Sequence, residues 1–68
     1  MNISSISENT ENGKITSVTY TFENVEPERD LGRTIEDVEA YLCCQYRKVG
    51  LSKQEREGDI FVVTFPVE

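Results

Sequence analysis

A tight turn followed by alternating residues constrains this chain more than any other feature. Asn12 and Gly13 both tolerate the positive φ angles of a type I′ turn, and Lys14 to Phe22 is interpreted as one alternating strand. If Asn12-Gly13 is a two-residue loop, Ile3 pairs with Phe22, Ser5 with Tyr20 and Ser7 with Val18. This hairpin would bury Ile3, Val18, Tyr20 and Phe22 and would turn Ile6, Ser17, Thr19 and Thr21 toward water.

A helix is predicted from Thr34 to about Val49. Thr34 can cap the first turn and Asp37 completes an approximate capping box, while Gly50 is expected to end the helix. Apolar residues recur at helical spacing and form one stripe: Ile35, Val38, Leu42, Tyr46 and Val49. Cys43 is expected at the rim of the core.

The last third of the chain predicts a second hairpin. Residues 60–67 are almost entirely apolar, which is typical of a central strand. Residues 51–57 are mostly charged after Leu51, which is typical of an exposed edge. Gly58-Asp59 or Glu57-Gly58 would form the turn. Between the first hairpin and the helix, residues 24–33 form one long connection.

These elements predict an α+β fold in the order ββαββ, as a single domain of residues 1–68. We expect a two-layer sandwich, in which one helix covers one face of a four-stranded, mainly antiparallel sheet. A chain of this length buries only about 60% of the surface that it exposes when unfolded, so the core is small.

The charge is unevenly distributed along the sequence. The net charge is −6, which disfavours direct binding to nucleic acid or to an anionic membrane. Residues 23–39 contain seven acids and two arginines, while residues 40–56 contain four basic residues and Glu55. We therefore expect an acidic end and a basic end.

The sequence predicts a cytoplasmic protein without cofactor or metal. No stretch approaches the roughly 20 apolar residues that span a bilayer, and Met1–Asn12 does not resemble a signal peptide. Cys43 and Cys44 are the only cysteines and there is no histidine, a composition that does not predict a zinc site.

No residue pattern predicts catalysis. The chain has no histidine and no glycine-rich phosphate loop, and acids near a helix start, such as Glu36 and Asp37, are ordinarily solvated. Arg47 and Lys48 would lower the pKa of a Cys44 thiol, but the nearby helix C-terminus opposes a thiolate. The chain is therefore predicted not to be an enzyme.

The acidic segment carries the main functional hypothesis. A row of carboxylates can occupy a protein groove that normally binds phosphates, as a nucleic-acid mimic. The predicted function is a small acidic binding protein, an inhibitor of a basic, nucleic-acid-handling protein, of the kind that mobile genetic elements encode. The residues expected to bind the partner are Glu23, Glu26, Glu28, Asp30, Glu36, Asp37 and Glu39. A competing interpretation is that these acids only keep a small domain soluble.

Two other functions remain open at this stage. The first is a homo-oligomeric assembly protein, with a dimer contact through Ala40 and Cys44 on the outer face of the helix and Tyr41 on its flank, or through the polar edge strand. The second is a small-molecule binder at a subunit interface, which requires an apolar cavity with a few polar groups. Ile60 and Val62, on the uncovered face of the last strand, also need a cover from a loop, a curled sheet or a partner.

Overall fold

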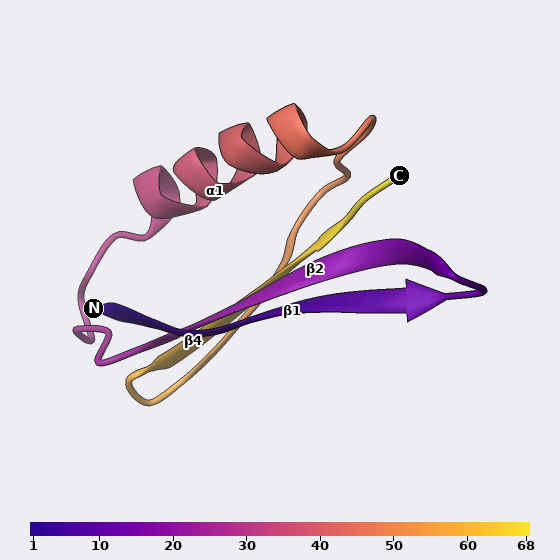
Figure 1. Ribbon diagram of the computed structural model, residues 1–68. Helices are drawn as coiled ribbons and strands as arrows, with labels where there is room; N and C mark the ends of the chain where they lie inside the picture. The colour runs from indigo at the N-terminus through magenta and orange to yellow at the C-terminus, as the bar shows by residue number, and fades with distance from the viewer.

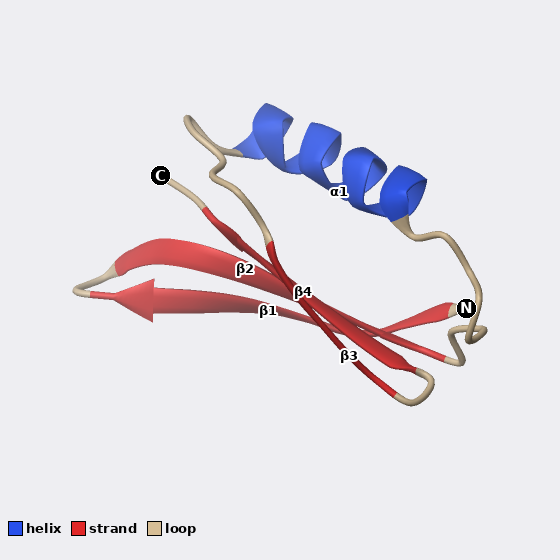
Figure 2. Ribbon diagram, turned by 180° about the vertical axis from the view of Figure 1, so that it is seen from behind, coloured by secondary structure: helices blue, strands red, loops and turns tan.

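The computed structural model describes residues 1–68 as four antiparallel strands in one open sheet, with a single helix across one face (Figures 1 and 2). The order of the strands in the sheet is β1-β2-β4-β3. This arrangement confirms the predicted α+β fold. The elements along the chain are β1 (Asn2–Glu11), β2 (Lys14–Glu23), α1 (Gly32–Gln45), β3 (Lys53–Glu57) and β4 (Ile60–Pro66).

The first hairpin has the predicted turn. Asn12 has φ +53° and Gly13 has φ +80°, the two positive angles that a type I′ turn requires. Glu11 pairs with Lys14, so the loop has two residues. Ile3 faces Phe22 at the other end of the hairpin, also as predicted.

The register in the middle of the hairpin differs from the prediction. Irregularities at Thr16 in β2 and at Ser4 in β1 each leave one residue without a partner. Followed from the turn outward, the irregularity at Thr16 shifts the pairing of the two strands by one residue, and the irregularity at Ser4 restores it. This is the effect of β-bulges. The predicted pairs of Ser5 with Tyr20 and Ser7 with Val18 are therefore wrong.

The actual pairs in this segment join Ile6 to Tyr20 and Glu8 to Val18. Because a shift of one residue moves every side chain to the other face of a sheet, Ile6 lies on the helix side instead of the predicted solvent face. Ile3, predicted to be buried, is 54% exposed. It lies on an edge strand whose residues are all exposed, where no further strand covers it.

The helix begins and ends earlier than predicted. It begins at Gly32 instead of Thr34, and no side chain caps it from the N-cap position Leu31. The Gly32 amide instead donates to Asp30 Oδ1 at 2.9 Å. The helix ends at Gln45, five residues before Gly50, because Tyr46 adopts extended backbone angles.

The segment after the helix ends it by pairing with the C-terminal residues. The amides of Arg47 and Lys48 donate to the Glu68 carbonyl, and the Gly50 amide donates to Pro66. Val49 forms a bridge with Val67. Val49 thus packs against the core as predicted, but from outside the helix.

The core lies between the helix and one face of β2 and β4. Leu42 is the only helical residue that is fully buried. The long connection adds Leu31 and also Val25, which is only 1% exposed and whose amide donates to the Asp59 carbonyl at 2.9 Å. The ten buried residues are Val18, Tyr20, Phe22, Val25, Leu31, Leu42, Phe61, Val63, Phe65 and Val67.

The second hairpin agrees with the prediction. β4 lies between β2 and β3, and β3 is an exposed edge. Gly58 has φ +60° and Glu57 pairs with Ile60, so Gly58-Asp59 is the turn. The face opposite the helix has no covering layer (Figure 2), and Ile60 remains 44% exposed there.

The single helix is neither long enough nor apolar enough to cross a membrane.

Candidate functional site

The seven predicted partner-binding acids are all exposed and belong to two neighbouring parts of the chain. Glu23 ends β2, and Glu26, Glu28 and Asp30 lie in the connection to the helix. The other three, Glu36, Asp37 and Glu39, lie in the middle of α1, and none of them is in its first turn. In Figure 1 the connection and the start of the helix lie at the end of the molecule that also holds the β3–β4 turn.

No basic side chain neutralises these carboxylates at close range. The one ion pair of the structure joins Lys53 to Glu55 at 4.0 Å, outside this group. Arg56 donates a hydrogen bond to the backbone carbonyl of Glu26, not to its carboxylate. Among the seven, only Asp30 accepts a hydrogen bond through its side chain, from the Gly32 amide.

The acids on the helix do not form one flat row. With about 100° between successive helical residues, Glu36 and Glu39 lie about 60° apart, while Asp37 is displaced about 100° from Glu36 in the other direction. The carboxylates therefore spread over about 160° of the helix circumference. A partner would meet a rounded acidic end.

The predicted basic end is incomplete. Arg47 and Lys48 follow the helix and share a hollow with Lys14 and Glu68. Arg56, however, contacts the acidic connection, so the basic residues of 40–56 do not gather in one place. They separate because β3 runs back along the sheet and carries its residues toward the acidic end.

The predicted helix contact residues are all accessible. Ala40, Tyr41 and Cys44 are exposed, with Tyr41 at 59%. Cys43 is exposed as well, so its predicted place at the core rim is wrong. Both thiols are free.

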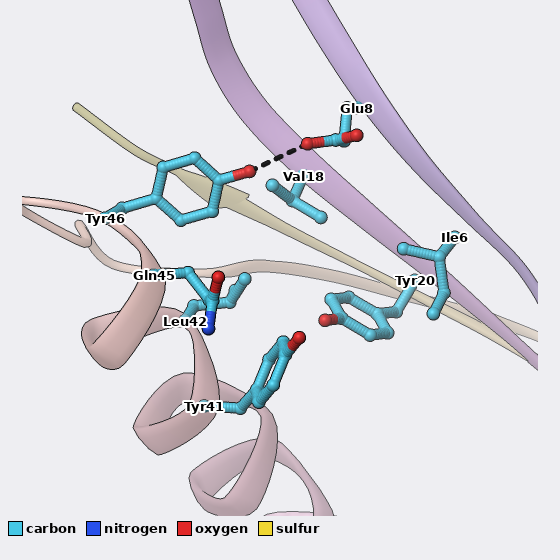
Figure 3. A pocket seen from close by; sticks show the side chains of 8 residues that line it. All are labelled: Ile6, Glu8, Val18, Tyr20, Tyr41, Leu42, Gln45 and Tyr46. Atoms are coloured by element: carbon cyan, nitrogen blue, oxygen red, sulfur yellow. Dashed lines mark hydrogen bonds between the residues drawn. The ribbon is translucent and has the colours of Figure 1, made fainter.

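The sequence did not predict a groove of about 360 Å³ between the first hairpin and the C-terminal half of α1 (Figure 3). Its walls come from β1, β2, α1 and the residue that follows α1. The shifted register is what turns two residues of β1 toward this groove. The lining residues are Ile6, Glu8, Val18, Tyr20, Tyr41, Leu42, Gln45 and Tyr46.

A hydrogen bond links the sheet to the end of the helix across this groove. The Tyr46 hydroxyl donates to Glu8 Oε2 at 2.9 Å (Figure 3). This bond raises the pKa of Tyr46 above its usual value of 10.0. Burial, followed by the nearby Tyr41 and Glu8, also raises the pKa of Tyr20. Both phenols are therefore neutral near pH 7.

No three or more side chains of the metal-binding types Cys, Asp, Glu and His come together in the structure.

Comparisons with known protein families, with curated proteins and with solved structures found no match to this chain.

Proposed function

We propose that this protein is a small, non-enzymatic binding protein that inserts its acidic end into a basic groove of a partner protein. The observation that carries the proposal is the state of the seven acids at this end: they are exposed and none forms an ion pair within the chain. In a chain of net charge −6, these charges remain available to an outside partner.

The chemistry of the surface favours a partner that handles nucleic acid. Exposed carboxylates on the connection and on the helix present negative charge at several points, as a phosphate backbone does, and grooves for nucleic acid are lined with Lys and Arg. Occupying such a groove would inhibit the partner. We also propose a cytoplasmic location, because two exposed and unpaired thiols suit a reducing compartment.

The test uses the whole chain and a matched pair of variants. The first variant carries Glu26→Lys, Glu28→Lys and Asp30→Asn, where the asparagine keeps the acceptor for the Gly32 amide. The control carries Glu11→Lys, Glu68→Lys and Glu55→Gln, which change the net charge by the same amount at other exposed positions.

Each chain is immobilised and used to capture proteins from a host lysate at low and high salt. We expect the natural chain and the control to retain a basic partner at low salt and to lose it as screening increases. The variant in the acidic connection should fail to retain it, with an unchanged circular dichroism spectrum. Equal retention by all three chains would contradict the proposal.

A competition experiment separates inhibition from simple adhesion. If the acidic end occupies a nucleic-acid groove, the purified partner should bind either this protein or a DNA duplex, but not both. Simultaneous binding of the two would refute the mimicry.

A second candidate function is homo-oligomeric assembly. β1 is an open edge of ten exposed residues without Lys, Arg or Pro, the residues that usually protect such an edge. Ala40 and Cys44 provide an accessible helix face as well. Light scattering on a sizing column distinguishes a dimer from the 7.8 kDa monomer, and a Cys44→Arg variant would remove only the helix contact.

A further inference from the structure

The groove between the first hairpin and α1 combines an apolar floor with polar walls. Val18 and Leu42, each only 2% exposed, belong to its lining and to the core. Its volume of about 360 Å³ falls within the range of small-molecule sites, which starts near 300 Å³. Such a floor offers contact to methyl and methylene groups.

The groove holds a single ionised side chain. Glu8 is the one acid among the lining residues, and no Lys or Arg lines the groove. Glu8 forms no ion pair, and the neutral Tyr46 hydroxyl is its only hydrogen-bond partner. The local charge therefore complements a monovalent cation.

Three tyrosines line the same groove as this charge. Tyr46 lies beside Glu8, while Tyr20 and Tyr41 lie toward the other end of the groove with their hydroxyl ends turned toward each other (Figure 3). The faces of aromatic rings attract a cation that is placed over them, most strongly when water is excluded. Burial is the main cause of the raised pKa of Tyr20, and the nearby Tyr41 and Glu8 add to it, so the Tyr20 hydroxyl stays neutral.

We propose that this groove binds a small organic cation that carries an alkylated ammonium group, as choline does. Glu8 would supply the counter-charge, and the tyrosine rings would contact the alkyl groups around the nitrogen. Leu42 and Val18 would pack under the rest of the ligand. An anion would meet the Glu8 carboxylate, and a neutral apolar ligand would bury that carboxylate without compensation.

This site is separate from the acidic end. Its lining residues come from the C-terminal half of α1, from Tyr46 directly after it and from the hairpin, and none of them is among the seven acids of the proposed function. The two proposals can therefore fail independently.

The test is a titration of the whole chain with choline, followed by NMR of the methyl groups of Ile6, Val18 and Leu42. The reference ligand is the neutral isostere of choline, in which carbon replaces nitrogen. We expect saturable shifts with choline and binding of the isostere that is about tenfold weaker, the effect of losing a cation–π contact and a counter-charge. No saturable shift up to about 100 mM choline, or equal binding of the isostere, would overturn the proposal.

Two variants of β1 provide a matched comparison. Glu8→Gln keeps an acceptor for Tyr46 but removes the charge in the groove, and Glu11→Gln removes an equal charge outside it. Choline should bind about tenfold more weakly to the first variant and as before to the second. An equal loss in both would show nonspecific attraction to an acidic protein and would contradict the site.

Tyr41 tests the aromatic contribution. Because this side chain is 59% exposed, Tyr41→Leu removes a ring without disturbing the core. The variant should keep the native NMR spectrum outside the groove and should lose the preference for choline over the isostere. If the variant kept its preference for choline over the isostere, the Tyr41 ring would not contribute to cation binding.

Discussion

Val25 shows how one residue of a connection contributes to the core. It lies in an acidic, proline-containing segment, yet it is only 1% exposed and its amide bonds to the β3–β4 turn. The buried side chain and the hydrogen bond together hold the connection against the sheet. The neighbouring acids therefore belong to a segment that is held in place against the sheet.

Removing the two methyl groups of Val25 should destabilise the folded state. Val25→Ala is expected to lower the free energy of unfolding by about 1.5 to 3 kcal/mol, through lost burial and a residual cavity. Leu51→Ala, at a side chain that is 93% exposed, should change it by less than about 0.5 kcal/mol. Urea denaturation measures both, and similar losses would mean that Val25 is not a core residue in solution.

The bond between Tyr46 and Glu8 predicts a dependence on alkaline pH. The folded pKa of Tyr46 is raised above 10.0, so the contribution of the neutral phenol to stability is complete below pH 10. It is lost as the pH rises through the folded pKa. In Glu8→Gln the pKa of Tyr46 should move down toward its usual value, because the bond to the carboxylate is the main cause of the shift.

NMR of the Tyr46 ring carbons against pH measures this pKa directly. Glu11→Gln, in the same strand, is the control and should leave the titration of Tyr46 unchanged. A Tyr46 that titrates identically in all three proteins would show that the bond to Glu8 does not persist in solution.

At the scale of elements, two residues are candidates for capping the start of the helix, Thr34 and Asp30. The sequence favours Thr34 as the cap, but in the structure Thr34 lies inside the helix and Asp30 accepts the Gly32 amide. Asp30→Ala should therefore cost about 1 kcal/mol, as the loss of a capping acceptor does. Thr34→Ala should change stability by less than about 0.5 kcal/mol, since alanine favours a helix interior.

Thermal unfolding compares these two variants, with Asp30→Asn as the control that keeps an acceptor. A large loss at Thr34 and none at Asp30 would place the start of the helix where the sequence pattern predicted it.

The elements also show what sequence patterns can and cannot predict. The turn at Asn12-Gly13 and a turn containing Gly58 were predictable, because few residues tolerate the positive φ angles of these three positions. The apolar run of β4 likewise predicted a central strand. The end of the helix was not predictable locally, because pairing of residues 47–50 with the C-terminal residues ends it before Gly50.

The groove was missed for a related reason. Its formation depends on a bulge at Thr16, and the only local sign of that bulge is that Ile15 and Val18 are both apolar although three residues apart. A strictly alternating strand would not place both on the helix side. The acids of the candidate partner surface, in contrast, could be identified from the sequence because exposed charge needs no tertiary partner.

At the scale of the whole molecule, unpaired acids make the folded state sensitive to salt. With a net charge of −6 and a single internal ion pair, repulsion between carboxylates should exceed attraction. Raising NaCl from 10 mM to 0.5 M shortens the Debye length from about 30 Å to about 4 Å. The free energy of unfolding should then rise by about 0.5 to 1 kcal/mol, a magnitude typical of exposed charges.

Urea denaturation at the two salt concentrations measures this change. The variant with Glu26→Lys, Glu28→Lys and Asp30→Asn has less repulsion to screen and should respond more weakly. A decrease in stability with added salt would instead show that attractive pairs dominate the surface.

The two bulges of the first hairpin also bear on how such a protein could diverge. A descendant in which Thr16 paired regularly instead of forming a bulge would keep its three tyrosines and its topology, yet Ser5 and Ser7 would occupy the positions opposite Tyr20 and Val18, and Ile6 and Glu8 would move to the reverse side. The loss of one bulge could thus abolish a ligand preference without altering any residue that touches the ligand. If two such proteins shared the three tyrosines in a sequence alignment, this would not show that they bind the same compound.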